Sequence, residues 1–324
     1  MGRLENGKWI DQWHNTKETQ GRYVRKPSIY RNWITKDGTA GPTGKGGFKA
    51  EKDRYHLYVS WACPWAHRTL IFRALKGLEE FISISVVNAI MRSHGWTFDD
   101  GYGVIADSVN NKRYLYEVYL EENKNYSGRV TVPLLWDKKT SSIVNNESAD
   151  IIRMFNSVFD DIGAKPGDYY PEDKRDAIND MNDYIYQNIN NGVYRSGFST
   201  TQEAYNEAIE TLFRGLDKLN SILSQQRYLI GDEVTESDWR LLPTLLRFDS
   251  VYHGHFKCNR KKIKEYEHLF NYAKELYQYS GIPDTYDDEY SKLHYYGSHE
   301  TINPSGVVAS GPIFEFARPH NRGS

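Results

Sequence analysis

Two strand-like segments that flank a helical pattern constrain the fold most strongly. "RYHLYVS" at 54–60 and "FISISVV" at 81–87 have the composition of strands, and "PWAHRTLIFRALKG" at 64–77 carries apolar residues at helical spacing. The segment 64–77 begins with a proline and ends with Gly77, the positions at which helices favour these residues. A strand, a helix and a strand of these lengths predict a βαβ unit and hence α/β architecture for this part of the chain.

The following sequence extends this unit into a small mixed-sheet domain. Residues 88–128 are a polar, glycine-containing interruption, after which "RVTVPLLWD" at 129–137 returns to strand character. "IVNNESADIIRMFNS" at 143–157 opens another helix, with Asn or Ser as its predicted cap. We therefore expect an α/β domain over residues 51–157. Residues 1–50, with the glycine-rich run "TKDGTAGPTGKGGF", predict an irregular N-terminal extension.

The second half of the chain has helical periodicity almost throughout, which predicts an all-helical domain over residues 171–324. Thr235 followed by Asp238 resembles a capping box at the start of one helix. From about residue 285 the sequence is rich in tyrosine, glycine and proline, which predicts ordered coil. One long stripe of leucines is expected on a single helix face: Leu212, Leu216, Leu219 and Leu223.

Composition narrows the class of ligand. The 324 residues carry a formal net charge of −2 without a long basic run, which argues against nucleic acid and membranes as partners and favours a small molecule. The polar start lacks the apolar core of a signal peptide, so we expect a cytoplasmic protein. The ten histidines show no compact ligand pattern; we expect no metal site, and His253 and His255 to be ordinary loop or surface residues.

The lone thiol of Cys63 stands where the first strand ends and the helix begins. Helix N-termini favour thiolate, the nucleophilic form. Moving a thiol from about 3% to about 90% ionised at pH 7 takes about 3.4 kcal/mol, whereas a helix end supplies at most about 2. We therefore expect further donors, such as tyrosine hydroxyls. Dithiol oxidoreductases carry a second cysteine three residues after the first, and in this chain that position is Ala66. A diffusible thiol must therefore resolve any mixed disulfide, and this points to glutathione.

Two short motifs are candidates for a glutathione site. A cis Val132–Pro133 bond would turn the backbone of Val132 outward to pair with an extended peptide. Glu147 and Ser148 at a helix start would hold the charged ends of a γ-glutamyl group. Each motif alone is also typical of an ordinary turn or cap.

Four stretches together resemble one family. "SWACPWAHR", "RVTVPLLWD", "NNESADIIRMF" and "YGSHETINPSGVV" are similar to those of glutathionyl-hydroquinone reductases, the Xi-class relatives of glutathione transferases, and to bacterial members in particular. The similarity extends along nearly the whole chain. It implies a thioredoxin-like domain followed by a helical domain, a homodimer formed through the helical part, and reduction of S-glutathionyl hydroquinones by glutathione.

The resemblance also implies roles for individual residues. Cys63 would be the nucleophile and would form a mixed disulfide that a second glutathione resolves, giving ping-pong kinetics. Tyr194 would be the proton donor or acceptor. Tyr252 and Tyr295, the latter preferred over its neighbour Tyr296, would contact the thiolate or the substrate. The glutathione-binding residues would be Trp96, which covers the tripeptide, with Arg129, Val130, Thr131, Val132, Glu147 and Ser148.

Three alternatives remain open from the residues. A conjugating glutathione transferase would activate the glutathione thiol itself and would keep its activity in Cys63→Ala. An omega-like thioltransferase or dehydroascorbate reductase would use the same cysteine. A non-catalytic thioredoxin-like binding module would not need Cys63, and its thiol would titrate at the reference value of about 8.5.

Overall fold

The computed structural model describes residues 2–12 and 15–323, and the chain divides into two compact units. The first comprises Met1–Trp13, Pro27–Gly167 and Thr285–His294. The second comprises His14–Lys26, Asp168–Asp284 and Tyr295–Ser324. This division departs from the expected one, because a segment far along the chain joins the α/β unit and a short N-terminal segment joins the helical unit.

A four-stranded mixed sheet forms the centre of the first unit. Its strand order is β4 (Ile82–Val86), β3 (Tyr55–Val59), β6 (Leu134–Asp137) and β7 (Ser142–Asn145). The pair β3 and β4 is parallel, while β6 and β7 each run antiparallel to their neighbour. The α1 helix (Pro64–Leu75) connects β3 to β4, which confirms the predicted βαβ unit.

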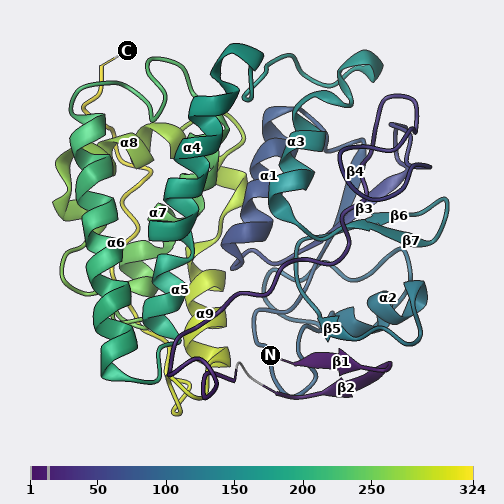
Figure 1. The fold of residues 1–324 in the computed structure, drawn as a ribbon, viewed down its shortest axis with the longest axis horizontal. Helices are drawn as coiled ribbons and strands as arrows, with labels where there is room; N and C mark the ends of the chain where they lie inside the picture. Colours follow the sequence, from purple (N-terminus) through teal and green to yellow (C-terminus); the bar gives the residue numbers. More distant parts are fainter. Residues whose placement is uncertain (1, 13–14, 324) are drawn as a thin grey trace. The chain divides into compact units, whose positions relative to one another are not determined.

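Helices cover this sheet. In Figure 1, α1 and α3 (Ser148–Ser157) lie together on one side of it, with α2 (Leu115–Glu122) on the other. Pro64 occupies the first turn of α1, where its missing N–H leaves no bond unmade. Gly77 follows the end of α1 with φ +60°, a left-handed conformation that glycine adopts without steric penalty.

The N-terminal extension is more ordered than we expected. It contains a hairpin of β1 (Arg3–Glu5) and β2 (Lys8–Ile10), and β1 pairs with β5 (Gly128–Arg129) in a second sheet. The hairpin strands have only three residues each, too few for a pattern to be recognised in the sequence. The glycine-rich run at 35–48 is irregular, as predicted.

Three local predictions within the α/β unit were wrong. The interruption at 88–128 contains the α2 helix. The expected single strand at 129–137 is divided between β5 and β6. The residues before α3 include β7, and the α3 cap is Glu147 rather than Asn or Ser, because its carboxylate accepts the Ala149 N–H at 3.3 Å.

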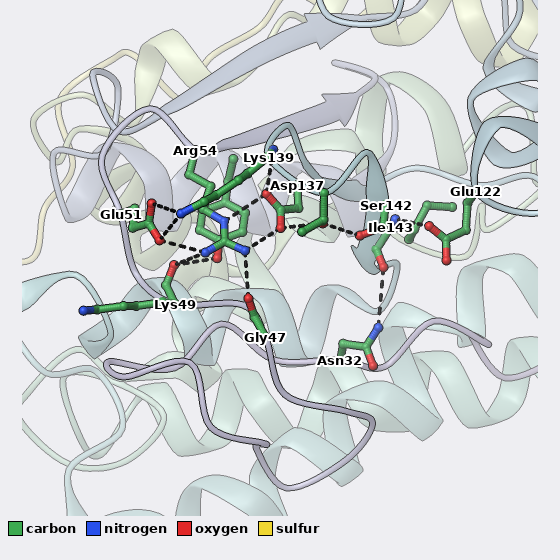
Figure 2. A network of polar contacts seen from close by, with 12 residues as sticks. Asn32, Gly47, Lys49, Glu51, Arg54, Glu122, Asp137, Lys139, Ser142 and Ile143 are labelled. Carbon is green, nitrogen blue, oxygen red and sulfur yellow. Dashed lines mark hydrogen bonds and ion pairs between the residues drawn. The ribbon is translucent and has the colours of Figure 1, made fainter.

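A buried ion pair fastens the loop before β3 to the sheet (Figure 2). The Arg54 guanidinium donates Nε to Asp137 Oδ1 at 2.9 Å and Nη2 to Oδ2 at 2.6 Å. The same guanidinium reaches Glu51 at 2.9 Å and the carbonyl of Gly47 at 2.8 Å. Burial opposes ionisation of Asp137, but hydrogen bonds from Arg54 and Thr140 outweigh it and hold the pKa of Asp137 below its usual value.

The second unit is helical. It contains α4 (Arg175–Ile185), α5 (Gly192–Gly197), α6 (Gln202–Leu223), α7 (Glu236–Arg247) and α8 (Glu267–Tyr277), with π-helical turns at Tyr186–Asn190 and Phe248–Tyr252. All four leucines of the predicted stripe are buried on α6. The predicted capping box is present, since Thr235 and Asp238 exchange their bonds at the start of α7.

The predicted coil after residue 285 was wrong in its first part. Residues Asp288–Ser298 form α9, and the irregular tail begins after this helix. The helix is divided between the units, because residues up to His294 group with the first unit and those from Tyr295 with the second. Among residues 2–12 and 15–323, no helix is both long and apolar enough to cross a membrane.

Candidate active site

Cys63 is the N-cap of α1. Its carbonyl accepts the His67 N–H at 2.9 Å, and its own N–H donates to the Ser60 carbonyl at 3.1 Å, which closes a turn between β3 and the helix. The half-buried thiol lies 3.5 Å from the carbonyl oxygen of Val132, to which it donates. A carbonyl stabilises the protonated thiol, so the thiolate must be stabilised by other groups, the helix terminus among them.

The segment beside the thiol has the predicted shape. The Val132–Pro133 peptide bond is cis. Within the described part of the chain, the Val132 N–H has no hydrogen-bond acceptor. The hydroxyl of Tyr119 donates to the Thr131 carbonyl at 2.9 Å, and this contact fixes the segment from the α2 side. A main-chain donor next to the thiol suits an extended peptide ligand.

Glu147 and Ser148 lie at the start of α3. Besides capping the helix, the Glu147 carboxylate accepts a hydrogen bond from Ser28 Oγ at 3.0 Å. Ser148 is buried, and its hydroxyl lies 3.5 Å from Glu147 Oε1. The N–H and the hydroxyl of Ser148 provide donors for a carboxylate, while Glu147 is suited to an ammonium group.

Arg129 and Trp96 are held by neighbours that the sequence did not indicate. The Arg129 guanidinium donates to the carbonyl oxygens of Gln12 at 2.8 Å and Gly2 at 3.4 Å, so the N-terminal hairpin orients it. Trp96, in the loop between β4 and α2, is buried and stacks on His294 with the ring centroids 4.8 Å apart. The segment 129–132 and both ligand-binding candidates at the start of α3 belong to the same unit as Cys63.

Three of the predicted tyrosines meet in the second unit. The hydroxyl of Tyr194, on α5, lies 2.7 Å from that of Tyr295, on α9. The Tyr295 hydroxyl also lies 3.2 Å from that of Tyr252, which ends the π-helical turn after α7. Burial raises the pKa of Tyr295 well above its usual range. Tyr295 is therefore neutral, and its hydroxyl is placed to share a proton with each of the other two.

Tyr296 lies outside this group of three hydroxyls. Its hydroxyl donates to the Ser250 carbonyl at 3.4 Å, and its ring meets His255 edge-on. His255 was expected in a loop or at the surface, but it is buried with Nε2 3.0 Å from His299 Nδ1. Nothing in the sequence signals this pair, because His255 and His299 are 44 residues apart.

Cys258, the second cysteine of the chain, lies in an inert environment. It is fully buried, and burial strongly raises the pKa of its thiol. Only Cys63 combines partial exposure with a helix terminus.

The sequence also gave no sign of Tyr290 and His294. Tyr290 is buried, donates its hydroxyl to the Val87 carbonyl, and interacts electrostatically with Cys63. His294 Nδ1 lies 2.8 Å from the Ala89 carbonyl. Both residues lie in a segment that we expected to be coil. No helical periodicity was recognised there, so neither residue was expected on a buried face.

Two family models and several relatives match this chain. A model of the glutathione S-transferase N-terminal domain matches residues 62–158, and one of the C-terminal domain matches residues 202–275. The glutathionyl-hydroquinone reductase YqjG of Escherichia coli is 54% identical over 323 residues, which cover 99% of this chain and 98% of that protein. The glutathionyl-hydroquinone reductase PcpF of Sphingobium chlorophenolicum is 52% identical over 312 residues, 96% of each chain.

Solved structures extend the agreement to the fold. The glutathione-bound structure of YqjG superposes with a TM-score of 0.91 over 99% of both chains, at 52% identity. A Xi-class glutathione transferase of Natrialba magadii superposes with a TM-score of 0.90 over 99% of this chain and 96% of that one, at 43% identity. The predicted thioredoxin-like and helical domains are thereby confirmed. The chain belongs to the glutathionyl-hydroquinone reductases, the Xi class of the glutathione transferase superfamily.

Proposed function

We propose that this chain reduces S-glutathionyl hydroquinones to hydroquinones with glutathione as the reductant. The observation that carries the proposal is the lone thiol of Cys63 at the N-cap of α1, beside the cis Val132–Pro133 bond. Its support is the full-length identity to two proteins named for this activity.

In the first step, the Cys63 thiolate attacks the glutathione sulfur that is bonded to the aromatic carbon. A sulfur–sulfur bond forms and the carbon–sulfur bond breaks, with its electron pair going to the ring carbon. That carbon takes up a proton, and the hydroquinone leaves. Cys63 remains as a mixed disulfide with glutathione.

In the second step, the thiolate of a free glutathione attacks the glutathione sulfur of the mixed disulfide. Oxidised glutathione leaves, and the Cys63 thiolate is restored. The sum consumes one glutathione and one S-glutathionyl hydroquinone, and releases oxidised glutathione and hydroquinone. The aromatic carbon is reduced and two sulfur atoms are oxidised, so the electrons balance without another cofactor.

We assign the proton of the first step to Tyr194, with Tyr295 and Tyr252 in support. The contacts of the three hydroxyl groups support this assignment, since loss of a proton from Tyr194 would be stabilised by the O–H of Tyr295 at 2.7 Å. Positioned acids of this kind contribute about 10²- to 10⁴-fold to a rate.

For the tripeptide, we propose main-chain pairing with Val132 and charge recognition by the α3 terminus. Glu147 would take the γ-glutamyl ammonium, and Ser148, through its N–H and its hydroxyl, would take its carboxylate. Arg129, with the backbone of Val130 and Thr131, would bind the rest of the tripeptide, which Trp96 would cover.

We also propose a homodimer through the helical unit and a cytoplasmic location, where abundant glutathione would supply the second step. Light scattering after size-exclusion chromatography would test the dimer, and a particle with the mass of one chain would refute it.

Steady-state kinetics test the proposed function. Varying glutathione at several concentrations of S-glutathionyl hydroquinone should give parallel double-reciprocal lines, as a ping-pong cycle requires. Cys63→Ala should lose the activity, while the matched Cys258→Ala should keep it. Hydroquinone release by Cys63→Ala at the wild-type rate would refute the mechanism, and conjugation of glutathione by that variant would identify a conventional transferase.

A further inference from the structure

Residues Thr285–His294, called here the returning segment, belong to the α/β unit although they follow nearly all of the helical part in sequence. The segment contacts the residues that position the thiol at three places. At its start, Thr285 Oγ1 lies 2.8 Å from His67 Nε2, and Tyr286 stacks on the His67 ring at 5.6 Å. His67 lies one turn after Cys63 on α1 and donates its N–H to the Cys63 carbonyl.

The second contact is made by Tyr290. A neutral phenol has one O–H to donate and lone pairs to accept. The O–H of Tyr290 goes to the Val87 carbonyl, so the oxygen is left to accept, and the side chain of Ser60 lies next to it as a donor. Burial raises the pKa of Tyr290 well above its usual range, so the phenol keeps its proton over the pH range in which a thiol titrates.

Ser60 transmits this contact to the nucleophile. Its hydroxyl accepts the Ala62 N–H at 3.3 Å, and its carbonyl accepts the Cys63 N–H at 3.1 Å. Tyr290 therefore holds the residue on which the turn before α1 is built. Within the segment, the Asp287 carboxylate accepts the Tyr290 N–H at 2.8 Å and so holds the main chain of Tyr290 in place.

The third contact, at the end of the segment, is made by His294. Its Nδ1 lies 2.8 Å from the Ala89 carbonyl and must carry the proton, because a carbonyl only accepts. That bond orients the ring, which lies against Trp96 at 4.8 Å with 22° between the planes.

We propose that the returning segment is a positioning element for the glutathione chemistry, in which Tyr290 fixes the turn that presents Cys63 and His294 fixes the ring of Trp96. The inference rests on the proposed function, since it concerns how the same site is held. Neither residue is assigned to touch the substrate.

Alkylation of Cys63 by iodoacetamide, followed against pH, tests the Tyr290 contact. In Tyr290→Phe, Cys63 should be alkylated about three- to tenfold more slowly at neutral pH, which corresponds to the loss of one hydrogen bond. The pH profile of alkylation should also move to higher pH, because the thiol lies less favourably at the helix terminus. Tyr55→Phe is the matched control, since Tyr55 is also buried in this unit and donates to a main-chain carbonyl, that of Lys49, at 2.6 Å. A Tyr290→Phe profile that superposes on those of wild type and Tyr55→Phe would overturn the proposal.

Ser60→Ala tests the same contact from its other side and replaces Tyr290→Phe if that variant does not fold. When both fold, the double variant should alkylate no more slowly than the slower single variant. Multiplying effects would show that the two residues act independently and would contradict the proposed transmission.

Calorimetric titration with glutathione tests the His294 contact. His294→Leu should bind glutathione about three- to tenfold more weakly, as expected for loss of one aromatic pair, with a wild-type alkylation profile. An unchanged glutathione Kd would overturn this half of the proposal. Both assays need no hydroquinone, so a chain without reductase activity would refute the proposed function while still reporting on these contacts.

Discussion

The hydroxyl oxygens of Tyr194 and Tyr295 lie 2.7 Å apart, and the second of them is also 3.2 Å from the hydroxyl of Tyr252. Tyr295 therefore contacts both of the other hydroxyls. Removing the Tyr295 hydroxyl removes both of these contacts.

Tyr295→Phe should lower kcat for hydroquinone release by about tenfold, since it deletes one or two hydrogen bonds that support the proposed acid. Tyr296→Phe should cause a smaller fall, because that hydroxyl bonds the Ser250 carbonyl instead. Tyr205→Phe, which removes a 2.6 Å bond to the Lys257 carbonyl, serves as the control in the same unit. A larger effect of Tyr296→Phe would reverse the assignment.

Iodoacetamide should modify one cysteine in the folded protein and two in urea. Cys63 is half-buried, whereas Cys258 is fully buried with a thiol pKa that burial strongly raises. Peptide mass mapping after alkylation locates the adducts, with Cys63→Ala as the control that should remain unmodified when folded. An adduct on Cys258 without denaturant would contradict this account of the two thiols.

His56 should make the protein sensitive to acid. Its Nδ1 and Nε2 lie 2.7 Å and 2.9 Å from the hydroxyls of Ser83 and Ser85, and burial lowers its pKa to about 4. An unfolded histidine takes up its proton near pH 6.5, so between these values the unfolded chain binds more protons and stability falls as the pH falls. The loss reaches about 3 kcal/mol for a shift of this size.

Urea unfolding at a series of pH values checks this expectation. His56→Gln should show a flatter decline of unfolding free energy below pH 6.5, whereas His268→Gln, on α8, should decline as the wild type does. A His56→Gln curve parallel to that of the wild type would assign the acid sensitivity to other groups.

Breaking the Arg54–Asp137 pair should be costly. Side-chain exposure is 5% for Arg54 and 0% for Asp137, so Asp137→Ala leaves the buried cation with the more exposed Glu51 as its carboxylate partner and should lower the unfolding free energy by about 3 kcal/mol. Arg54→Met combined with Asp137→Leu should lose less than Asp137→Ala alone, because both charges are gone. Urea titration measures both variants, and a larger loss in the double variant would contradict the argument.

The elements that the sequence predicted well have long, regular apolar patterns. The βαβ unit and the α6 leucine face are examples, and in both the residues that determine the pattern are buried. α9 was missed because its buried positions include Tyr290, Lys292, His294 and Tyr295, polar or aromatic residues that do not form a recognisable apolar stripe. β7 was missed because four residues are too few for an alternation to stand out.

The candidate site likewise contains some residues that the sequence indicated and others that it did not. Cys63 was identifiable because a helix start and a missing second cysteine are local signals, and Glu147 because it precedes a strong helix pattern. Tyr290, His294 and the bond between Tyr194 and Tyr295 depend on segments about 100 to 200 residues apart, as the separations of 101 and 203 residues show. Local periodicity carries no information about such pairs.

The most direct test is the intact mass of wild type and Cys63→Ala after each is mixed with an S-glutathionyl hydroquinone in the absence of free glutathione. The account predicts a single glutathione adduct on the wild type alone, together with one equivalent of hydroquinone. No adduct and no hydroquinone from the wild type, or hydroquinone released equally by Cys63→Ala, would contradict attack by Cys63.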